Sequence, residues 1–252
     1  MKADISKKAQ IGRGVKIGYG AVIGDSVEIG DHSEIGYHAV IIGHTRIGRN
    51  NKIHPGAVIG NITQALAYKG EESFVQIGDN NSIREYVTIN ASPADGTPTE
   101  IGNDNLIMAY SHIAHHCKVG NNVIIANSGT MGGHVTIEDN VVIGGLAAIH
   151  QFCRVGKLAI IGGLCKVVQD VVPFVTCDGN PAEICGLNTI GLKRAGLSPR
   201  DLSTLKKAYR YLFRSGLNNT QALKILEKEL GHEELVCYLI DFIKNCSRGI
   251  IR

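Results

Sequence analysis

The sequence contains no tryptophan, and aromatic residues make up only 5% of its 252 residues. A core with so few large rings must be built from aliphatic side chains, which fits the 44% of hydrophobic residues. No stretch approaches the ~20 consecutive apolar residues of a membrane span. The charged start at residues 1–8 is followed by no apolar run, so we expect neither a membrane span nor an export signal.

The sequence also lacks a large excess of charge of one sign, and its cysteines show no paired motif. The net charge of +3 is too small to indicate nucleic-acid binding. The seven cysteines are odd in number, scattered, and include no Cys-x-x-Cys pair. This pattern predicts neither a disulfide framework nor a structural zinc site. A cytoplasmic protein in a reducing compartment is the natural prediction.

What the sequence has in abundance is a period of six residues. Isoleucine recurs at positions 5, 11, 17, 23, 29, 35, 41, 47, 53 and 59, with glycine following it at 12, 18, 24, 30, 36, 48 and 60. Neither a helix nor a strand hairpin has this period. A single hexad cannot bury its apolar side chains, so the hexads must coil and stack into a parallel β-helix. At the glycines we expect corners that fold closely or take up positive φ.

Hexads of this kind resemble the left-handed parallel β-helix, in which three hexads form one triangular coil of 18 residues. The six-residue repeat covers residues 5–60, 77–90 and 101–172. Residues 61–76 and 91–100 interrupt it and are predicted to be loops that project from the prism. Long loops on a rigid scaffold often carry binding sites. We therefore predict a mainly β domain over residues 1–185.

Residues 186–252 are predicted to form a small helical subdomain that closes one end of the prism. Ser198 and Pro199 are typical of an N-cap followed by proline at the first helical position, with Gly216 as a stop. Two more helices are expected at about 220–230 and 233–245.

The coil length also predicts neighbours, because residues 18 apart lie on adjacent coils, roughly 4.8 Å from one another. His115 should therefore lie above Gly133 and Gln151, and His116 above His134, with His112 three residues before the column. A histidine base beside a backbone N–H that can hold an oxyanion is what acyl transfer requires.

Two other interpretations of these residues stay open. Polar residues and glycines are common at corners for purely structural reasons. Clustered histidines on adjacent coils can also hold zinc, and one branch of carbonic anhydrases has this type of fold.

The ordered motifs in the chain are more specific than the hexads. His112-Ile-Ala-His115, Gly133-His134, Ile149-His-Gln-Phe152, Gln169-Asp-Val171 and the ending Arg248-Gly-Ile-Ile-Arg252 resemble the UDP-N-acetylglucosamine O-acyltransferase family, which begins lipid A biosynthesis. The resemblance covers nearly the whole chain. It implies a homotrimer with sites between prisms, no metal, and no cofactor besides the phosphopantetheine that acyl carrier protein brings.

The resemblance also implies roles for individual residues. His115 matches the general base and Gly133 the oxyanion donor. Residues that match the substrate cleft or the nucleotide and donor contacts are His112, His134, His150, Gln151, Gln64, Asn188, Lys193 and Arg194. Gly163 matches a glycine that leaves room for the acyl chain, and Pro181 lies in the region that measures its length.

Several positions differ from the family pattern. Ala65 and Ala67 replace a carboxylate and an ammonium in the first loop, and His116 replaces the acidic residue that usually follows the base. Ala195 replaces the second arginine of a pair, and Pro181 stands where a histidine is common. The prediction is an acyltransferase that moves a 3-hydroxyacyl chain from acyl carrier protein to the 3-hydroxyl of UDP-N-acetylglucosamine.

Alternatives to this function are N-acylation of a 3-amino analogue of the sugar, a zinc hydratase, and a catalytically silent paralogue. A cluster of cations supports the acyl-carrier partner. Against the single acid Asp201, residues 193–214 carry Lys193, Arg194, Arg200, Lys206, Lys207, Arg210 and Arg214. Such a patch would attract an acidic carrier protein, although a solvated helical face has the same composition.

Overall fold

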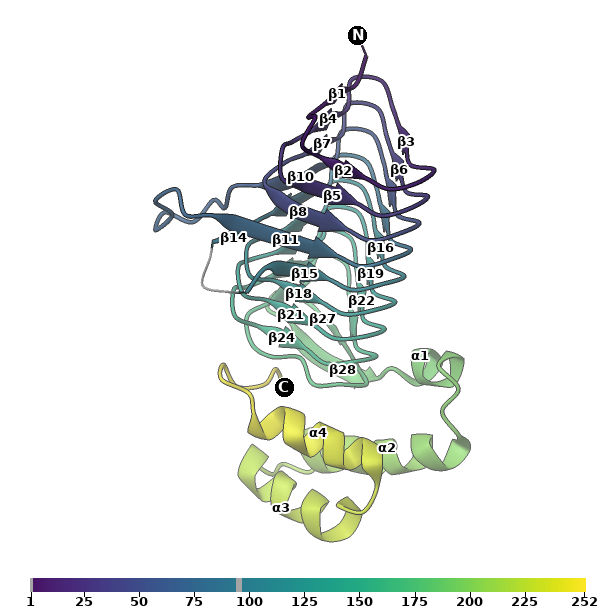
Figure 1. The fold of residues 1–252 in the computed structure, drawn as a ribbon. Coiled ribbons are helices and arrows are strands. Elements are labelled where there is room, and N and C mark those ends of the chain that lie inside the picture. Colours follow the sequence, from purple (N-terminus) through teal and green to yellow (C-terminus); the bar gives the residue numbers. More distant parts are fainter. Residues whose placement is uncertain (1, 94–96) are drawn as a thin grey trace.

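The computed structural model describes residues 2–93 and 97–252. Their strands form three sheets, which we call A, B and C, and the chain visits the three in turn so that each coil is a triangle. The coils stack into a prism that runs from the N-terminal tip to the helices (Figure 1). The predicted stack of hexads is confirmed.

The strands are short, and successive members of a sheet are parallel. Sheet A contains β1 (Asp4–Ile5), β4 (Val22–Ile23), β7 (Val40–Ile41), β10 (Val58–Asn61), β13 (Thr88–Asn90), β17 (His112–Ile113), β20 (Thr130–Met131), β23 (Ala148–Ile149) and β26 (Lys166–Val167). Sheet B contains β2 (Gln10–Ile11), β5 (Val27–Ile29), β8 (His44–Ile47), β11 (Ser73–Ile77), β15 (Thr99–Ile101), β18 (Lys118–Val119), β21 (Thr136–Ile137) and β24 (Arg154–Val155), and β14 (Ser92–Pro93) pairs antiparallel with β11. Sheet C contains β3 (Lys16–Ile17), β6 (Glu34–Ile35), β9 (Lys52–Ile53), β12 (Ser82–Ile83), β16 (Leu106–Ile107), β19 (Ile124–Ile125), β22 (Val142–Ile143), β25 (Ile160–Ile161), β27 (Val175–Asp178) and β28 (Glu183–Leu187).

The repeated isoleucines fill the inside of the prism. Ile41, Ile59 and Ile113 are fully buried, whereas Ile5 and Ile11 at the tip are 40% and 38% exposed. The difference follows from stacking, because the first coil has a neighbour on one side only. Each coil therefore completes the core of the next.

The corners differ from the prediction in one respect. Close approach is confirmed at Gly12, where an added Cβ would lie 2.7 Å from the Asp31 backbone nitrogen. Positive φ is confirmed at Gly60, with φ of 81°, but at most corners it occurs two residues later in the hexad, at positions such as His116, Asn122 and Asn140, with φ of 57°, 55° and 60°. Asparagine and histidine tolerate this conformation better than most residues.

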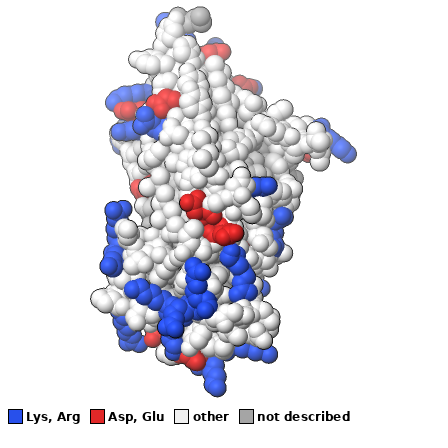
Figure 2. All heavy atoms as spheres, turned by 180° about the vertical axis from the view of Figure 1, so that it is seen from behind, with Lys and Arg blue, Asp and Glu red and all other residues white. Residues whose placement is uncertain are grey.

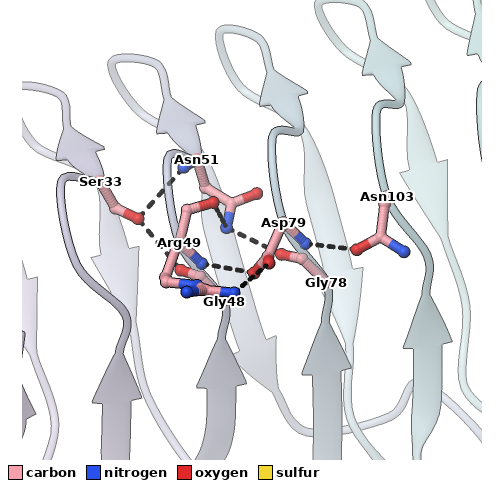
Figure 3. A network of polar contacts seen from close by, with 7 residues as sticks. All are labelled: Ser33, Gly48, Arg49, Asn51, Gly78, Asp79 and Asn103. Carbon is pink, nitrogen blue, oxygen red and sulfur yellow. Dashed lines mark hydrogen bonds and ion pairs between the residues drawn. The ribbon is translucent and has the colours of Figure 1, made fainter.

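A ladder of buried asparagines joins neighbouring coils along the edge between sheets B and C. The Asn51 amide nitrogen donates to the Gly78 carbonyl at 2.8 Å, and its side-chain oxygen accepts from the Asn81 N–H at 2.9 Å. Asn81 repeats these bonds on the next coil: its amide nitrogen donates to the Gly102 carbonyl, and its side-chain oxygen accepts from the Asn105 N–H. Figure 3 shows the start of this ladder at Ser33 and Asn51, beside an outer row that includes Asp79 and Asn103.

Replacing Asn81 with valine is expected to lower the free energy of unfolding by about 3 kcal/mol, because buried donors and acceptors on two coils lose their partner at once. The measurement is a urea titration followed by circular dichroism. Asn80→Gly is the matched control, since Asn80 is exposed with φ of 61° and glycine accepts that conformation. Equal midpoints for the two variants would contradict the role of the ladder.

Helices cover the last coil. They are α1 (Thr189–Arg194), α2 (Pro199–Phe213), α3 (Asn219–Leu230) and α4 (Glu234–Lys244). The three predicted helices are confirmed, including the Ser198 cap on α2. None of the helices within residues 2–93 and 97–252 combines the length and the apolar character that a membrane span needs.

The end of the prism was not predicted in full. The β domain was expected to reach residue 185 with hexads only to residue 172, and the structure adds the strands β27 and β28 after the last hexad and the unforeseen helix α1. The base of the prism then binds the helices through aromatic rings. Arg154 lies 4.3 Å from the centre of the Phe242 ring, and Lys157 lies 3.7 Å from that of Tyr238.

Candidate active site

Two insertions leave the prism at the same edge, the one between sheets A and B. The first, residues 62–72, connects β10 to β11, and the second connects β13 to β15 and includes residues 94–96, which lie outside the described residues. On the following coils this edge carries the turns after β17, β20 and β23. The loop at 62–72 and the strand β14 of the second insertion both lie on the left in Figure 1. The A–B edge therefore combines long loops with the predicted histidine column.

The column itself is confirmed. The His134 N–H donates to the His115 carbonyl at 3.0 Å, and the Phe152 N–H donates to the Gly133 carbonyl at 3.0 Å, so these turns lie directly on one another. The His115 ring lies over Gly133, since a Cβ added to Gly133 would be 2.6 Å from both Cε1 and Nε2 of that ring. Only glycine leaves space for the ring at this point.

The surroundings of His115 favour a neutral ring with a defined tautomer. Burial, reinforced by His116 and His134, lowers the pKa of His115 below its ordinary value of 6.5. Its Nδ1 lies 2.8 Å from Nδ1 of His116, so one of these nitrogens carries the shared proton. When that proton is on His115, Nε2 has a free lone pair and faces Gly133. The ring is then ready to accept a proton.

His116 and His134 form a stack with an aromatic ring that the sequence interpretation did not single out. The rings of His116 and His134 are 4.3 Å apart and nearly parallel, and His134 stacks on Phe152 at 4.6 Å. All three residues have positive φ, which points successive side chains of the column the same way. Phe152 lies 18 residues after His134, so the same spacing rule could have predicted that its ring joins this stack.

The backbone N–H of Gly133 is placed to bind an anion. On the B–C edge the same hexad position is capped: the Asn103 N–H donates to Oδ1 of Asn121 at 2.8 Å, and the Asn121 N–H to Oδ1 of Asp139 at 2.7 Å. Among the described residues no acceptor takes the Gly133 N–H. Comparison of the two edges indicates that an oxygen of a bound ligand can occupy the equivalent place.

Several predicted residues lie near the column on the same edge. His112 on β17 is half-buried, accepts or donates a 2.7 Å hydrogen bond with Thr88, and has its pKa lowered by burial. The inserted loop puts Thr88 24 residues away, so the 18-residue rule missed this partner. His150 and Gln151 are exposed in the turn after β23. Gln64 is exposed in the loop at 62–72.

Other predicted residues lie on the remaining edges. Gly163 is in a turn of the C–A edge. Pro181 lies beside β26, because the Lys166 N–H donates to the Gly179 carbonyl and the Lys166 carbonyl accepts from the Ala182 N–H. Lys193 and Arg194 are exposed at the end of α1, on the far side from the loops in Figure 1. One chain therefore does not bring all predicted residues into one site.

Asn188 has a structural role that the sequence did not predict. It is 5% exposed; its side-chain oxygen accepts from the Gly191 N–H at 2.9 Å and its amide donates to the Leu158 carbonyl at 2.8 Å. These bonds cap α1 and anchor it to the prism. Contact of Asn188 with a substrate remains a prediction.

Comparison with known proteins agrees with this geometry. Residues 8–43 and 98–133 match the model of bacterial transferase hexapeptide repeats. The fold and the base column thus define a hexapeptide-repeat acyltransferase with a left-handed β-helix. Residues 170–251 match the model for domain 2 of UDP N-acetylglucosamine O-acyltransferase.

Whole-chain relatives are more specific. The chain is 47% identical over 203 residues to the acyl-[acyl-carrier-protein]–UDP-N-acetylglucosamine O-acyltransferase of Synechocystis, covering 79% of this chain and 74% of that one. It is 51% identical over 213 residues to that of Thermodesulfovibrio yellowstonii, covering 84% and 83%. The crystal structure of a UDP-N-acetylglucosamine acyltransferase from Bacteroides fragilis superposes with a TM-score of 0.97 at 44% identity, covering 99% of this chain and 98% of that one. The chain belongs to the family of acyl-[acyl-carrier-protein]–UDP-N-acetylglucosamine O-acyltransferases.

Proposed function

We propose that the protein transfers a 3-hydroxyacyl chain from acyl carrier protein to the 3-hydroxyl of UDP-N-acetylglucosamine, the first step of lipid A biosynthesis. The observation that carries this proposal is the His115 ring over Gly133, at the edge from which both loops leave. The names of the whole-chain relatives supply the two substrates. The proposed enzyme is cytoplasmic.

In the proposed reaction Nε2 of His115 removes the proton of the sugar hydroxyl while the oxygen attacks the thioester carbonyl. The Gly133 N–H stabilises the resulting oxyanion. As the intermediate collapses, the C–S bond breaks and the departing thiolate takes the proton from His115. The products are the sugar ester and the free carrier thiol.

His116 supports this chemistry in place of the usual carboxylate. Its Nδ1 accepts the proton of His115 Nδ1 across 2.8 Å, which keeps the base in the reactive tautomer. We assign no cofactor beyond the carrier's phosphopantetheine. We also assign no acyl-enzyme, because burial raises the pKa of the Cys117 thiol to about 12 and its Sγ contacts the Gly132 carbonyl.

The distribution of the residues supports the proposal of a homotrimer. A prism edge is convex, so a second prism is needed to enclose a substrate there. The C–A edge offers a surface for this, a row of exposed apolar side chains that we call the C–A row: Tyr19, Tyr37, Tyr86, Tyr110, Leu146 and Leu164. If the C–A edge of one copy contacts the A–B edge of the next, the contact is heterologous, and such contacts can close into a ring. We propose that this ring contains three chains.

Leu146→Asp with Leu164→Asp is expected to convert the trimer to monomers, because these side chains are 61% and 69% exposed in the single chain and charge would be unfavourable in a contact. Aspartate tolerates the positive φ of both positions. Light scattering after size exclusion distinguishes one chain of 27.0 kDa from three. Asn140→Asp, at the same hexad position on another edge, is the control. A trimer that persists in the double variant would contradict the role of the C–A row.

The acyl carrier protein is proposed to dock on the basic helices. Figure 2 shows Lys and Arg side chains gathered over the helical end of the molecule. Within residues 193–214, all seven cations are exposed, and Arg200 and Lys207 form ion pairs with Glu233 and Glu229. The net positive charge of this segment would speed association with an acidic partner.

The identity of the acceptor depends on the first loop. Gln64 is followed there by Ala65, Leu66 and Ala67, and Leu66 is fully exposed. A 3-amino sugar would be acylated by the same base, and a silent paralogue would acylate neither sugar. The test is release of carrier thiol from 3-hydroxyacyl carrier protein, measured with and without UDP-N-acetylglucosamine. Sugar-dependent release supports the proposal, and its absence at all acyl lengths overturns it.

The acid limb of activity should report the pKa of His115. A base must be neutral to act, and burial lowers this pKa, so kcat/KM should fall toward low pH with a midpoint below pH 6.5. The measurement is kcat/KM for the sugar between pH 4.5 and 8, after preincubation at each pH to exclude unfolding. A midpoint clearly above 6.5 would be inconsistent with a half-buried neutral base.

A further inference from the structure

Three histidines from two coils meet at the proposed active site. One ring nitrogen from each of His115, His116 and His134 lies within 4.8 Å of the other two, and all three side chains are half-buried. Nδ1 of His115 and Nδ1 of His116 are 2.8 Å apart. The ring centres of His115 and His134 are 5.1 Å apart. We call this group the His cluster.

The His cluster has the chemistry of a transition-metal site. Neutral imidazole is a good ligand for Zn²⁺, and Zn–N bonds of about 2.0–2.1 Å in a tetrahedral arrangement put ligand nitrogens about 3.4 Å apart. The separation between the Nδ1 atoms of His115 and His116 is 2.8 Å, and all three ligand nitrogens lie within 4.8 Å of one another. Because the rings of His116 and His134 are stacked, side-chain rotation must turn their lone pairs toward a common ion.

The backbone supports the cluster independently of any metal. His116 and His134 have φ of 57° and 60°, and the His134 N–H is bonded to the His115 carbonyl. The two side chains are thereby fixed on adjacent coils with their rings stacked 4.3 Å apart. His112 does not belong to the cluster, because its Nδ1 is bonded to Thr88. The candidate ligands therefore come from two coils.

We propose that His115, His116 and His134 bind a borderline divalent metal ion of the Zn²⁺ class, and that the bound ion inhibits acyl transfer. The ion would replace the proton that His115 and His116 share. The fourth coordination position is left to water. The binding part of this proposal is independent of the proposed function, whereas the inhibitory part rests on it.

Inhibition follows from the protonation of His115. A neutral imidazole carries one proton, so a metal on Nδ1 leaves that proton on Nε2, where it occupies the lone pair that would deprotonate the sugar. A metal on Nε2 would use the same lone pair directly. In both cases the base is lost. Free zinc would thus be a reversible inhibitor of the enzyme.

The binding experiment is equilibrium dialysis of the full chain against ZnCl₂, with metal and protein quantified in each compartment. We expect one zinc ion per chain and a loss of affinity of about 100-fold or more in His116→Asn and in His134→Asn. Asparagine preserves the left-handed corner, as it does at Asn122 and Asn140. His32→Asn is the control, since His32 has φ of 59° on the B–C edge. Absence of zinc binding, or equal affinity in all four proteins, would overturn the proposed site.

A second readout separates the site from the function. Co²⁺ in place of Zn²⁺ should give a tetrahedral absorption spectrum that both cluster variants lose and His32→Asn retains. Thiol release by the wild type should fall as zinc occupancy rises and recover on addition of EDTA. Zinc that saturates the site without slowing turnover would overturn the inhibitory part. A protein that binds zinc but never acylates a sugar would refute the proposed function while leaving the site intact.

Discussion

Replacing His115 with alanine is expected to lower kcat by about 10²–10⁴-fold, the range that a general base contributes. The reason is that Nε2 of this ring is the lone pair that faces Gly133, while Nδ1 is occupied by His116. Binding of either substrate should change much less than kcat. The measurement is steady-state turnover by thiol release at saturating sugar, accompanied by light scattering of the variant.

Two controls make the loss at His115 interpretable. His32→Asn changes an exposed histidine on the B–C edge and should turn over normally. Added imidazole should restore part of the turnover of His115→Ala, because the substitution leaves space beside Gly133. A His115→Ala variant with near-normal kcat would show that this ring is not the base.

Gly133→Ala is expected to reduce kcat by at least about 10²-fold, the loss seen when one oxyanion donor is removed. The added methyl group would lie 2.6 Å from Cε1 and Nε2 of His115, so it must displace the base as well as hinder a ligand at the Gly133 N–H. Gly133 has no positive φ, so alanine adds no backbone strain at this position. The variant should therefore fold normally and lose turnover.

The matched control is Gly186→Ala, because a Cβ added at Gly186 would meet no atom within 4 Å. Thiol release and thermal unfolding are measured for both variants. We expect unfolding temperatures close to that of the wild type for both, with turnover lost only at Gly133. Wild-type turnover in Gly133→Ala would contradict the contact between ring and glycine as the catalytic unit.

The period of six was sufficient to predict most of the fold. Each isoleucine that begins a hexad must point inward, and repetition leaves no other way to bury it, so coil length and the three sheets follow. The chain after Pro173 was harder to predict, because β28 is antiparallel and follows no hexad. Its pairing depends on contacts with the last coil, which the local sequence does not encode.

The column of His115 and Gly133 could likewise be predicted, because an 18-residue step is a local rule. The partner of His112 could not, since the loop at 91–100 lengthens the step to 24 residues. The position of His116 was known from the sequence, but its bond to Nδ1 of His115 depends on side-chain rotation at a corner with positive φ. Gly163 lies on the C–A edge and Lys193 on α1, away from the A–B edge that carries His115. They can share a site with His115 only if a neighbouring copy brings its own Gly163 and Lys193 to that edge.

The central claim is that this edge acylates a UDP-linked sugar. Mass spectrometry tests it directly, after incubation with 3-hydroxyacyl carrier proteins of several lengths and equal amounts of UDP-N-acetylglucosamine and its 3-amino analogue. We expect UDP-N-acetylglucosamine to gain the mass of one 3-hydroxyacyl group as an ester that mild base cleaves, and His115→Ala to form almost none. Exclusive formation of a base-stable amide on the analogue would replace O-acylation by N-acylation, and the absence of any acylated sugar would contradict the account.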